Sequence, residues 1–486
     1  MSENPLILLM ICSFMFVPLF LAEIAGKKVL PTGSSFFLQS RKMGVLPMYA
    51  TVFATWMSAF AFMGAIAYFY EEGPIYMTTV GWDALFALLF YLLGRRIWFY
   101  GKQHNYITAT DFFSDIYGSK TLNLLVTGIS FVFTILYLQV QMVGGLFLIE
   151  VATGGFISWK ASGLIFFLVL VVYLWAGGLR AVTFADAFYA VLIIVTILAS
   201  GFFLIQVAGG IEVVFDRLVE ENLQAVVLSG GGRIGLWICM FLVVPMGAFM
   251  GPQMWIRNYA AKEERNFELL PLLLCISSIV CIGTLFAGNA GMILKPGGGA
   301  ADTLIAELML ENANPIFCTF IFLGIAAAIF STANSQIHAM SVMYAIDIHK
   351  RYINKKLPEK SLVPVAKWAL LFISAIAYLM LLLIPKNIFD MGILALSGLA
   401  QLIVPVIGGL FFSRSKGKAA ICGLIFGTLS FFALVIFSPL DTSISAVLAL
   451  GLNGLTFVLL SFLLPQEPNT KRKIIQYKQN FTQGIK

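Results

Sequence analysis

Residues 324–336 read GIAAAIFSTANSQ, and this is the most informative stretch of the chain. Its glycine and alanines let the backbone of a second helix approach closely, as small residues do in membrane helices. The hydroxyl and amide side chains that follow lie within about one helical turn; they are Ser331, Thr332, Asn334 and Ser335. They offer neutral, hard oxygen ligands, which suit a monovalent cation better than imidazole or thiolate. The same side chains could instead only join helices by hydrogen bonds, and composition leaves both interpretations open.

The rest of the chain is too apolar for a soluble protein. Of its 486 residues, 60% are hydrophobic and 11% are charged, whereas soluble proteins average roughly 45–50% and 25%. The surplus apolar surface must face lipid, which excludes a soluble enzyme, a nucleic-acid-binding protein and a disordered chain. The six cysteines lie in apolar stretches without a CxxC pair, so we expect neither a disulfide framework nor a metal cluster.

Apolar stretches long enough to cross a bilayer, which takes about 20 residues each, predict an all-α polytopic membrane protein with thirteen helices. We number them span 0 to span 12. They lie at about residues 5–25, 46–70, 75–94, 121–149, 157–176, 184–208, 235–256, 269–293, 314–346, 363–384, 390–412, 419–438 and 442–464. Span 0 lacks a basic n-region and its apolar run is too long for a signal peptide, so we expect it to be retained.

Basic residues predict the orientation in the membrane. If the N-terminus lies outside, 26 of the 31 lysines and arginines fall in cytoplasmic loops or in the tail. The positive-inside rule therefore favours an external N-terminus and a cytoplasmic C-terminus. The same tally leaves no lysine or arginine for the middle of a span, so we expect an anionic solute to meet no buried cation. After Pro465 we expect only a solvated basic tail, residues 466–486.

Two acids and one interrupted span are candidates for function. Asp83 lies deep in span 2, where a buried acid needs a partner, water or a solute. Asp186, at the start of span 5, either pairs with Arg180 as a helix-start acid or holds a cation or proton inside the protein. Span 6 carries Pro245 and Pro252 with two glycines between them. Such a sequence kinks or breaks a helix, and broken helices persist in lipid only where the freed backbone lines a cavity or binds something.

These motifs resemble those of the sodium:solute symporter family, and the resemblance extends over nearly the whole chain. The matching pieces are GGLRAVTFAD at 177–186, GPQMWIR at 251–257, AAAIFSTANSQ at 326–336, and the pair Gly408-Gly409 followed by the basic run 414–418.

The resemblance implies a LeuT-type fold of two inverted five-helix repeats, about 46–208 and 235–412, with spans 1 and 6 unwound at mid-membrane. Two extra helices, 419–464, would complete a single transmembrane domain, 1–465.

The resemblance also implies sodium as the coupling ion, with no other cofactor. In the family a sodium ion lies between spans 1 and 8, and the matching ligands here are the carbonyls of Ala54, Met57 and Ala328 with the hydroxyls of Ser331 and Thr332. Some members hold a second sodium near span 5, and the matching positions are Asp186, Ser331, Asn334 and Ser335. Asn334 stands where a hydroxyl is more usual. Coupling to protons is an alternative that the sequence leaves open.

Departures from the family pattern narrow the range of candidate solutes. The acid that proline carriers place in span 1 corresponds to Thr55, and Gln139 and Gln141 lie where sialic-acid carriers have an arginine. The segment VQMVGG at 140–145 and the span 8 motif are most similar to pantothenate and monocarboxylate carriers. The polar candidates for solute contact are Thr55, Ser58, Asp83, Gln141 and Gln253.

These features predict a plasma-membrane symporter that uses sodium to import a small organic solute, such as a monocarboxylate or pantothenate. A carrier of a sugar or amino acid, and a sensor that binds solute without moving it, are the alternatives. One sodium ion moving down 100 mV releases about 2.3 kcal/mol, and a tenfold gradient adds about 1.4 kcal/mol. No HExxH or GxSxG motif occurs, so no enzyme is predicted.

Overall fold

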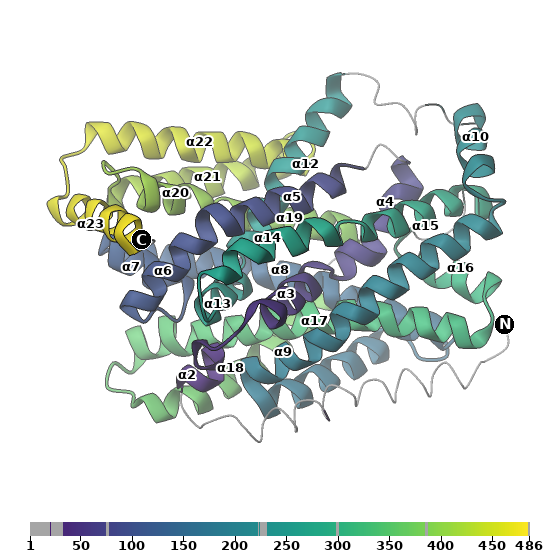
Figure 1. The fold of residues 1–486 in the computed structure, drawn as a ribbon, viewed down its shortest axis with the longest axis horizontal. Helices are drawn as coiled ribbons and strands as arrows, with labels where there is room; N and C mark the ends of the chain where they lie inside the picture. Colours follow the sequence, from purple (N-terminus) through teal and green to yellow (C-terminus); the bar gives the residue numbers. More distant parts are fainter. Residues whose placement is uncertain are drawn as a thin grey trace.

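The computed structural model describes residues 20, 33–73, 77–221, 223, 231–297, 301–383 and 387–484. Within these ranges every regular element is helical. The long helices run along the horizontal axis of Figure 1, with α23, α6 and α7 at one end and α10 and α16 at the other. We call these the α23 end and the α10 end.

In chain order the helices are α2 (Gly33–Leu38), η1 (Gln39–Arg41), α3 (Val45–Trp56), η2 (Phe60–Gly64), α4 (Ala65–Glu72), α5 (Thr78–Leu89), η4 (Phe90–Gly94), α6 (Arg95–His104), α7 (Ala109–Tyr117), α8 (Lys120–Ala152), α9 (Trp159–Val207), α10 (Ile211–Glu221), α12 (Gly231–Met250), α13 (Pro252–Ala260), α14 (Arg265–Ser277), α15 (Val280–Leu294), η5 (Ala301–Thr303), α16 (Leu304–Asn312), α17 (Pro315–Met343), η6 (Tyr344–Ile353), η7 (Glu359–Ser361), α18 (Leu362–Leu381), α19 (Ile388–Ala400), α20 (Ile403–Phe411), α21 (Gly417–Phe437), α22 (Thr442–Leu463) and α23 (Pro468–Gly484).

The predicted membrane spans have counterparts among these helices. In the described part of the chain, nine helices are long and apolar enough to cross a bilayer, and two bent pairs raise the number to eleven. A shorter apolar helix, Trp159–Val172, matches predicted span 4. The all-α membrane fold is therefore confirmed for spans 1 to 12, while span 0, at 5–25, lies outside the described residues apart from residue 20.

Two spans are broken, as the resemblance implies. Val45–Trp56 and Phe60–Glu72 meet at 58°, and Ile234–Met250 and Pro252–Ala260 meet at 59°. The first break follows from Met57, whose ψ of 69° leaves the helical range. The second lies at Gly251, and Pro252 then begins α13, a position where its missing N–H removes no helical hydrogen bond.

Predicted span 5 starts earlier than the hydropathy pattern indicates. Within α9 the helix is interrupted only at Gly178, whose φ of 59° is in the left-handed region. A Cβ at this position would also meet the backbone oxygen of Phe36 at 2.8 Å, so glycine is required on both counts. Because the span begins here, Asp186 lies about two turns inside it rather than at its edge.

The C-terminal tail is helical and packed, not solvated as we expected. Helix α23 buries the side chains of Ile474, Tyr477 and Phe481. The Tyr477 ring stacks on that of Tyr100 in α6, with 4.3 Å between the ring centroids. The three side chains recur at intervals of three and four residues, which is the pattern of an amphipathic helix. The basic residues 471–473 and Lys478 obscured this pattern in the sequence.

Candidate functional site

Helix α17 is the interior element that carries the candidate site. All of its residues from Gly324 to Met343 are buried. A Cβ at Gly324 would lie 1.9 Å from the Thr196 hydroxyl of α9, so the absence of a side chain permits this close packing. The small residues at the start of the motif therefore position the hydroxyls that follow them.

Two hydroxyls of α17 face the broken end of α3. Ser331 donates to the carbonyl oxygen of Ala54 at 2.7 Å, and Thr332 donates to that of Thr55 at 2.9 Å. Both hydroxyls also lie close to the Ala328 carbonyl oxygen, at 3.0 and 3.3 Å. Three carbonyl oxygens and two hydroxyls thus meet between spans 1 and 8.

The break in span 1 is what makes these carbonyls accessible. In a continuous helix, the carbonyls of Ala54 and Thr55 would accept from the N–H groups four residues later. Instead, Ser58 N donates to Trp56 O at 2.9 Å, and Ala59 N donates to the side-chain oxygen of Gln141 at 3.0 Å. The amide of Gln141 on α8 therefore caps the second half of the span and holds the break open.

The oxygen set fits a sodium ion by its chemistry. Of the five predicted ligands, four are joined directly by hydrogen bonds: Ala54, Ala328, Ser331 and Thr332. Met57 forms the break itself and is buried, although no hydrogen bond between described residues ties its carbonyl to α17. The Thr55 carbonyl is an additional oxygen that the sequence did not indicate. All are neutral oxygens, the ligand type that hard cations prefer.

A charged cluster lies one turn further along α17. Arg257 of α13 forms an ion pair with Asp186 of α9 at 3.3 Å, and it donates to Ser335 at 2.6 Å. The same guanidinium donates to the hydroxyls of Thr51 and Thr55 on α3, both at 2.7 Å. The Arg257 side chain is 1% exposed and that of Asp186 is 0% exposed, so the pair lies fully in the interior.

The buried guanidinium contradicts our expectation that no cation lies inside the protein. We assigned Arg257 to the loop after span 6 because it follows the apolar run. The 59° bend at Gly251 instead turns α13 back into the protein, where every residue of the helix is buried. The ion pair of Asp186 among the described residues is with Arg257, not with Arg180 as we considered.

The predicted second sodium site is organised around this arginine. Asp186 and Ser335 are brought together, but both contact the guanidinium of Arg257. The side chain of Asn334 is buried, and neither of its amide atoms has a hydrogen-bond partner among the described residues. In this arrangement a fixed cation of the chain already occupies the space between the expected ligands, so these residues do not fit a second sodium ion.

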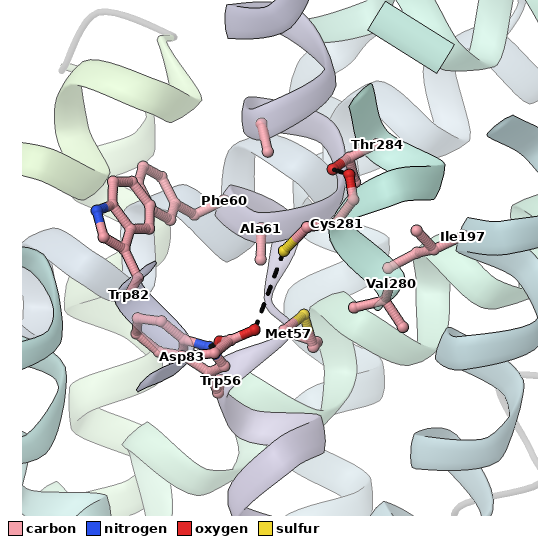
Figure 2. A pocket seen from close by; sticks show the side chains of 11 residues that line it. Trp56, Met57, Phe60, Ala61, Trp82, Asp83, Ile197, Val280, Cys281 and Thr284 are labelled. Carbon is pink, nitrogen blue, oxygen red and sulfur yellow. Dashed lines mark hydrogen bonds between the residues drawn. The ribbon is translucent and has the colours of Figure 1, made fainter. Parts of the chain in front are cut away.

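A small cavity lies on the other side of the span 1 break. It has a volume of about 30 Å³. Its lining residues are Trp56, Met57, Phe60, Ala61, Ala65, Trp82, Asp83, Ile197, Val280, Cys281 and Thr284. Figure 2 shows Asp83, Trp56 and Cys281 turned toward one another. The carboxylate of Asp83 accepts from the Trp56 indole N–H and from the Cys281 thiol, the latter at 3.9 Å.

The five residues predicted to contact solute do not form one pocket. Asp83 lines the cavity, whereas the Thr55 hydroxyl belongs to the arginine cluster. Ser58 pairs with the Tyr137 hydroxyl at 3.1 Å, and Gln141 caps the break. Gln253 is buried on α13, where its backbone carbonyl oxygen accepts from the Arg257 guanidinium at 2.9 Å.

Sequence reasoning missed the two residues that donate hydrogen bonds to Asp83, which are Trp56 and Cys281. Trp56 directly follows Thr55, which is one of the predicted solute contacts. In the sequence Trp56 is indistinguishable from the other apolar residues of span 1. Cys281 is one of the six cysteines in apolar stretches, from which the sequence predicts no polar role. A hydropathy pattern does not reveal which of two apolar residues faces a buried acid on another helix.

Comparisons with known proteins identify relatives of the whole chain. The sequence profile described as the sodium:solute symporter family matches residues 36–427. The chain is 24% identical to the sodium/pantothenate symporter of Haemophilus influenzae, with 82% of this chain and 84% of the relative covered. It is also 24% identical to the sodium/proline symporter of the same species, with 84% of each covered.

Among solved structures, the chain resembles a Na+-coupled sialic acid symporter in its substrate-bound outward-open state. The TM-score is 0.82 at 17% identity, with 96% of this chain and 99% of that chain covered. This likeness supports the LeuT-type fold.

Proposed function

This chain belongs to the sodium:solute symporter family, and we propose from that premise that sodium drives its import of a small organic solute by alternating access. The sodium ion binds between spans 1 and 8, at the oxygens of Ala54, Thr55, Ala328, Ser331 and Thr332. Met57 contributes its carbonyl from the break. We place the protein in the plasma membrane, as its multi-pass architecture and bacterial relatives suggest.

The observation that carries this proposal is the double role of the span 1 break. On one side, the carbonyls of Ala54 and Thr55 face the α17 hydroxyls. On the other side, Trp56 and Met57 line the cavity that holds Asp83. Because four consecutive residues serve both places, an ion that orders the carbonyls also orders the cavity wall. This supplies a physical link between sodium binding and solute binding.

The solute is a small organic molecule that carries a carboxylate. The relatives named for pantothenate and proline support this class. None of the eleven residues that line the cavity is basic. The carboxylate of the solute therefore binds the sodium ion or the backbone N–H groups at the breaks, as anionic substrates bind half-helix N-termini in other transporters.

The α23 end faces the cytoplasm in this proposal. The support is the count of basic residues: 26 of 31 are assigned to that side when the N-terminus is external, and 25 remain when the interior Arg257 is left out. A cysteine introduced on the exposed face of α23 and another on α10 would test the orientation. We expect a membrane-impermeant thiol reagent applied to intact cells to label the α10 cysteine only.

Solute flux into proteoliposomes tests the function. With an inward sodium gradient, we expect labelled L-proline, pantothenate or lactate to accumulate above the external concentration, and potassium in place of sodium to abolish the accumulation. A solute sensor would bind the same compound with sodium present and would not concentrate it. Sodium-independent equilibration of every solute would overturn the proposal.

A further inference from the structure

We propose that the cavity beside Asp83 binds a positively charged ammonium group, so that the solute of this symporter is an ammonium compound. This inference rests on the proposed function and names the class of solute more closely. It depends on three observations: the uncompensated charge of Asp83, the aromatic walls and the size of the cavity.

The charge of Asp83 has no fixed counter-charge. Its side chain is 3% exposed, and its two hydrogen-bond donors, the indole of Trp56 and the thiol of Cys281, are neutral. In the ranges that the structure describes, no lysine, arginine or histidine forms an ion pair with it. A carboxylate buried without a counter-charge is unfavourable, and an ionisable group inside a membrane protein commonly marks the path of a ligand.

Asp186, another buried acid of the interior, differs from Asp83 in this respect. Asp186 has Arg257 at 3.3 Å, so its charge is neutralised by the chain itself. Asp83 lines a cavity instead, and the other ten lining residues are uncharged. A cation that enters the cavity gives Asp83 the positive counter-charge that the Arg257 guanidinium gives Asp186.

Aromatic rings form the wall of the cavity around this acid. Trp56, Phe60 and Trp82 all line it. The rings of Phe60 and Trp82 stack at 5.9 Å with an angle of 8° between their planes. Phe60 also stacks on Phe389 and Trp56 on Phe86, so part of these ring faces is covered. Figure 2 shows this pair together on one side of the cavity, next to Asp83. Electron-rich ring faces attract ammonium groups, and an adjacent carboxylate adds a direct charge interaction.

The volume of the cavity limits what it can hold in this conformation. About 30 Å³ accommodates a group the size of one or two water molecules, which is the size of a primary or secondary ammonium group. A trimethylammonium group needs a wider cavity than this conformation offers, and a whole solute does not fit. The remainder of the solute must extend past the break in span 1, whose residues Trp56 and Met57 form part of the wall. A carboxylate placed in the cavity would face Asp83 and be repelled.

An ammonium group can belong to a zwitterionic amino or imino acid or to a simple amine or quaternary ammonium ion. Binding to the purified full chain separates these sources. L-proline is compared with cyclopentanecarboxylate, in which carbon replaces the ring nitrogen. Choline is compared with its uncharged isostere, in which a tert-butyl group replaces trimethylammonium. Lactate and pantothenate serve as carboxylates without an ammonium group, and all titrations are made in sodium chloride.

We expect the charged member of at least one pair to bind at least about tenfold more tightly than its uncharged counterpart. A preference within the proline pair alone indicates a zwitterionic solute, which keeps the carboxylate of the proposed function. A preference within the choline pair alone indicates a monovalent cation and replaces that carboxylate. The variant Asp83→Asn keeps an acceptor for the Trp56 indole but loses the charge, so we expect it to reduce the preference to about threefold or less. The matched control, Asp216→Asn, removes an exposed acid of α10 and leaves the preference unchanged.

The comparison within each pair uses the native chain, so it decides the question even if Asp83→Asn does not fold. Equal binding of both members of each pair, or binding of none of the ammonium probes, overturns the inference. Sodium-driven uptake of lactate or pantothenate with no ammonium preference would sink it while leaving the proposed function intact. An ammonium preference without any sodium-driven uptake would overturn the proposed function and leave the ammonium site in place.

Discussion

Two layers of polar side chains on α17, one helical turn apart, meet the same helix α3 in different ways. In the first layer, Ser331 and Thr332 contact the carbonyl oxygens of Ala54 and Thr55, and every group is neutral. In the second, Ser335 contacts Arg257, which also reaches Asp186. The neutral layer offers oxygens to a mobile cation, whereas the charged layer contains a cation that belongs to the chain.

This difference shows that oxygen-bearing side chains alone do not define a sodium site. Asp186 and Ser335 look like better ligands than two neutral hydroxyls, because one of them carries a charge. The approach of Arg257 from α13 reverses this ranking. What decides between the two layers is the bend at Gly251, which lies far in sequence from the α17 side chains of both layers.

The largest effect should follow from removing the fixed cation. Replacing Arg257 by leucine leaves Asp186 buried without its ion-pair partner, and breaking a buried pair from one side costs about 3–5 kcal/mol of folding stability. We expect a large fall in the midpoint of thermal unfolding of the detergent-purified protein. The double variant Arg257→Leu with Asp186→Leu should recover most of the loss, because replacing both partners by apolar groups is often neutral. If the single variant were as stable as the native chain, the charged layer would not be the structural unit that we describe.

A smaller effect should follow from removing the cap of the span 1 break. In Gln141→Leu the N–H of Ala59 loses its acceptor, and an unsatisfied buried donor costs about 1–3 kcal/mol. Because this amide holds the break that exposes the carbonyls, we also expect a higher sodium concentration for half-maximal uptake. The control is Gln139→Leu, on the same helix, whose amide donates to Ala377 at 3.1 Å, away from the break. It should lose stability without a change in sodium dependence; equal sodium dependence in both variants would count against the capping role.

The smallest effect should come from an ion pair near the surface. Lys473 of α23 contacts Asp115 of α7 at 2.8 Å, but its side chain is 42% exposed. Pairs of this kind contribute about 0.2–1 kcal/mol, so Lys473→Met should lower the unfolding midpoint only slightly. A loss as large as that of Arg257→Leu would show that exposure does not separate the two pairs. The exposed Lys471→Met is the control.

The pH dependence of the same contact has a definite sign. Burial alone would raise the pKa of Asp115, but hydrogen bonds from Lys473, Tyr106 and Tyr477 outweigh it and hold that pKa below its ordinary value. The folded state therefore binds this proton less readily than the unfolded state. Its contribution to stability is present at neutral pH and is lost as the pH falls below about 3.9. Unfolding midpoints of native chain and Asp115→Asn should converge as the pH is lowered.

The sequence was sufficient for features that are local or periodic. Hydropathy located spans 1 to 12, and the Gly251-Pro252 pair indicated the break in span 6. The hydroxyls of Ser331 and Thr332 were recognisable because they lie next to each other after a run of small residues.

Features that depend on the meeting of distant segments could not be predicted in this way. Arg257 looked like a loop residue until the bend of α13 was known. The donors to Asp83 come from α3 and α15, about 27 and 198 residues away along the chain. The packing of α23 was hidden because its three buried apolar residues lie among basic and amide side chains.

The sodium dependence of uptake, measured in three variants of the neutral layer, tests the central claim most directly. Each hydroxyl replaces a water ligand of the ion, so Ser331→Ala or Thr332→Ala should raise the sodium concentration for half-maximal uptake by about tenfold or more, which corresponds to about 1.4 kcal/mol. Thr332→Ser keeps the oxygen and should change it far less. Uptake is measured in proteoliposomes across a range of sodium concentrations, with potassium as the replacement ion. Native sodium dependence in both alanine variants would contradict the assignment of this layer as the sodium site.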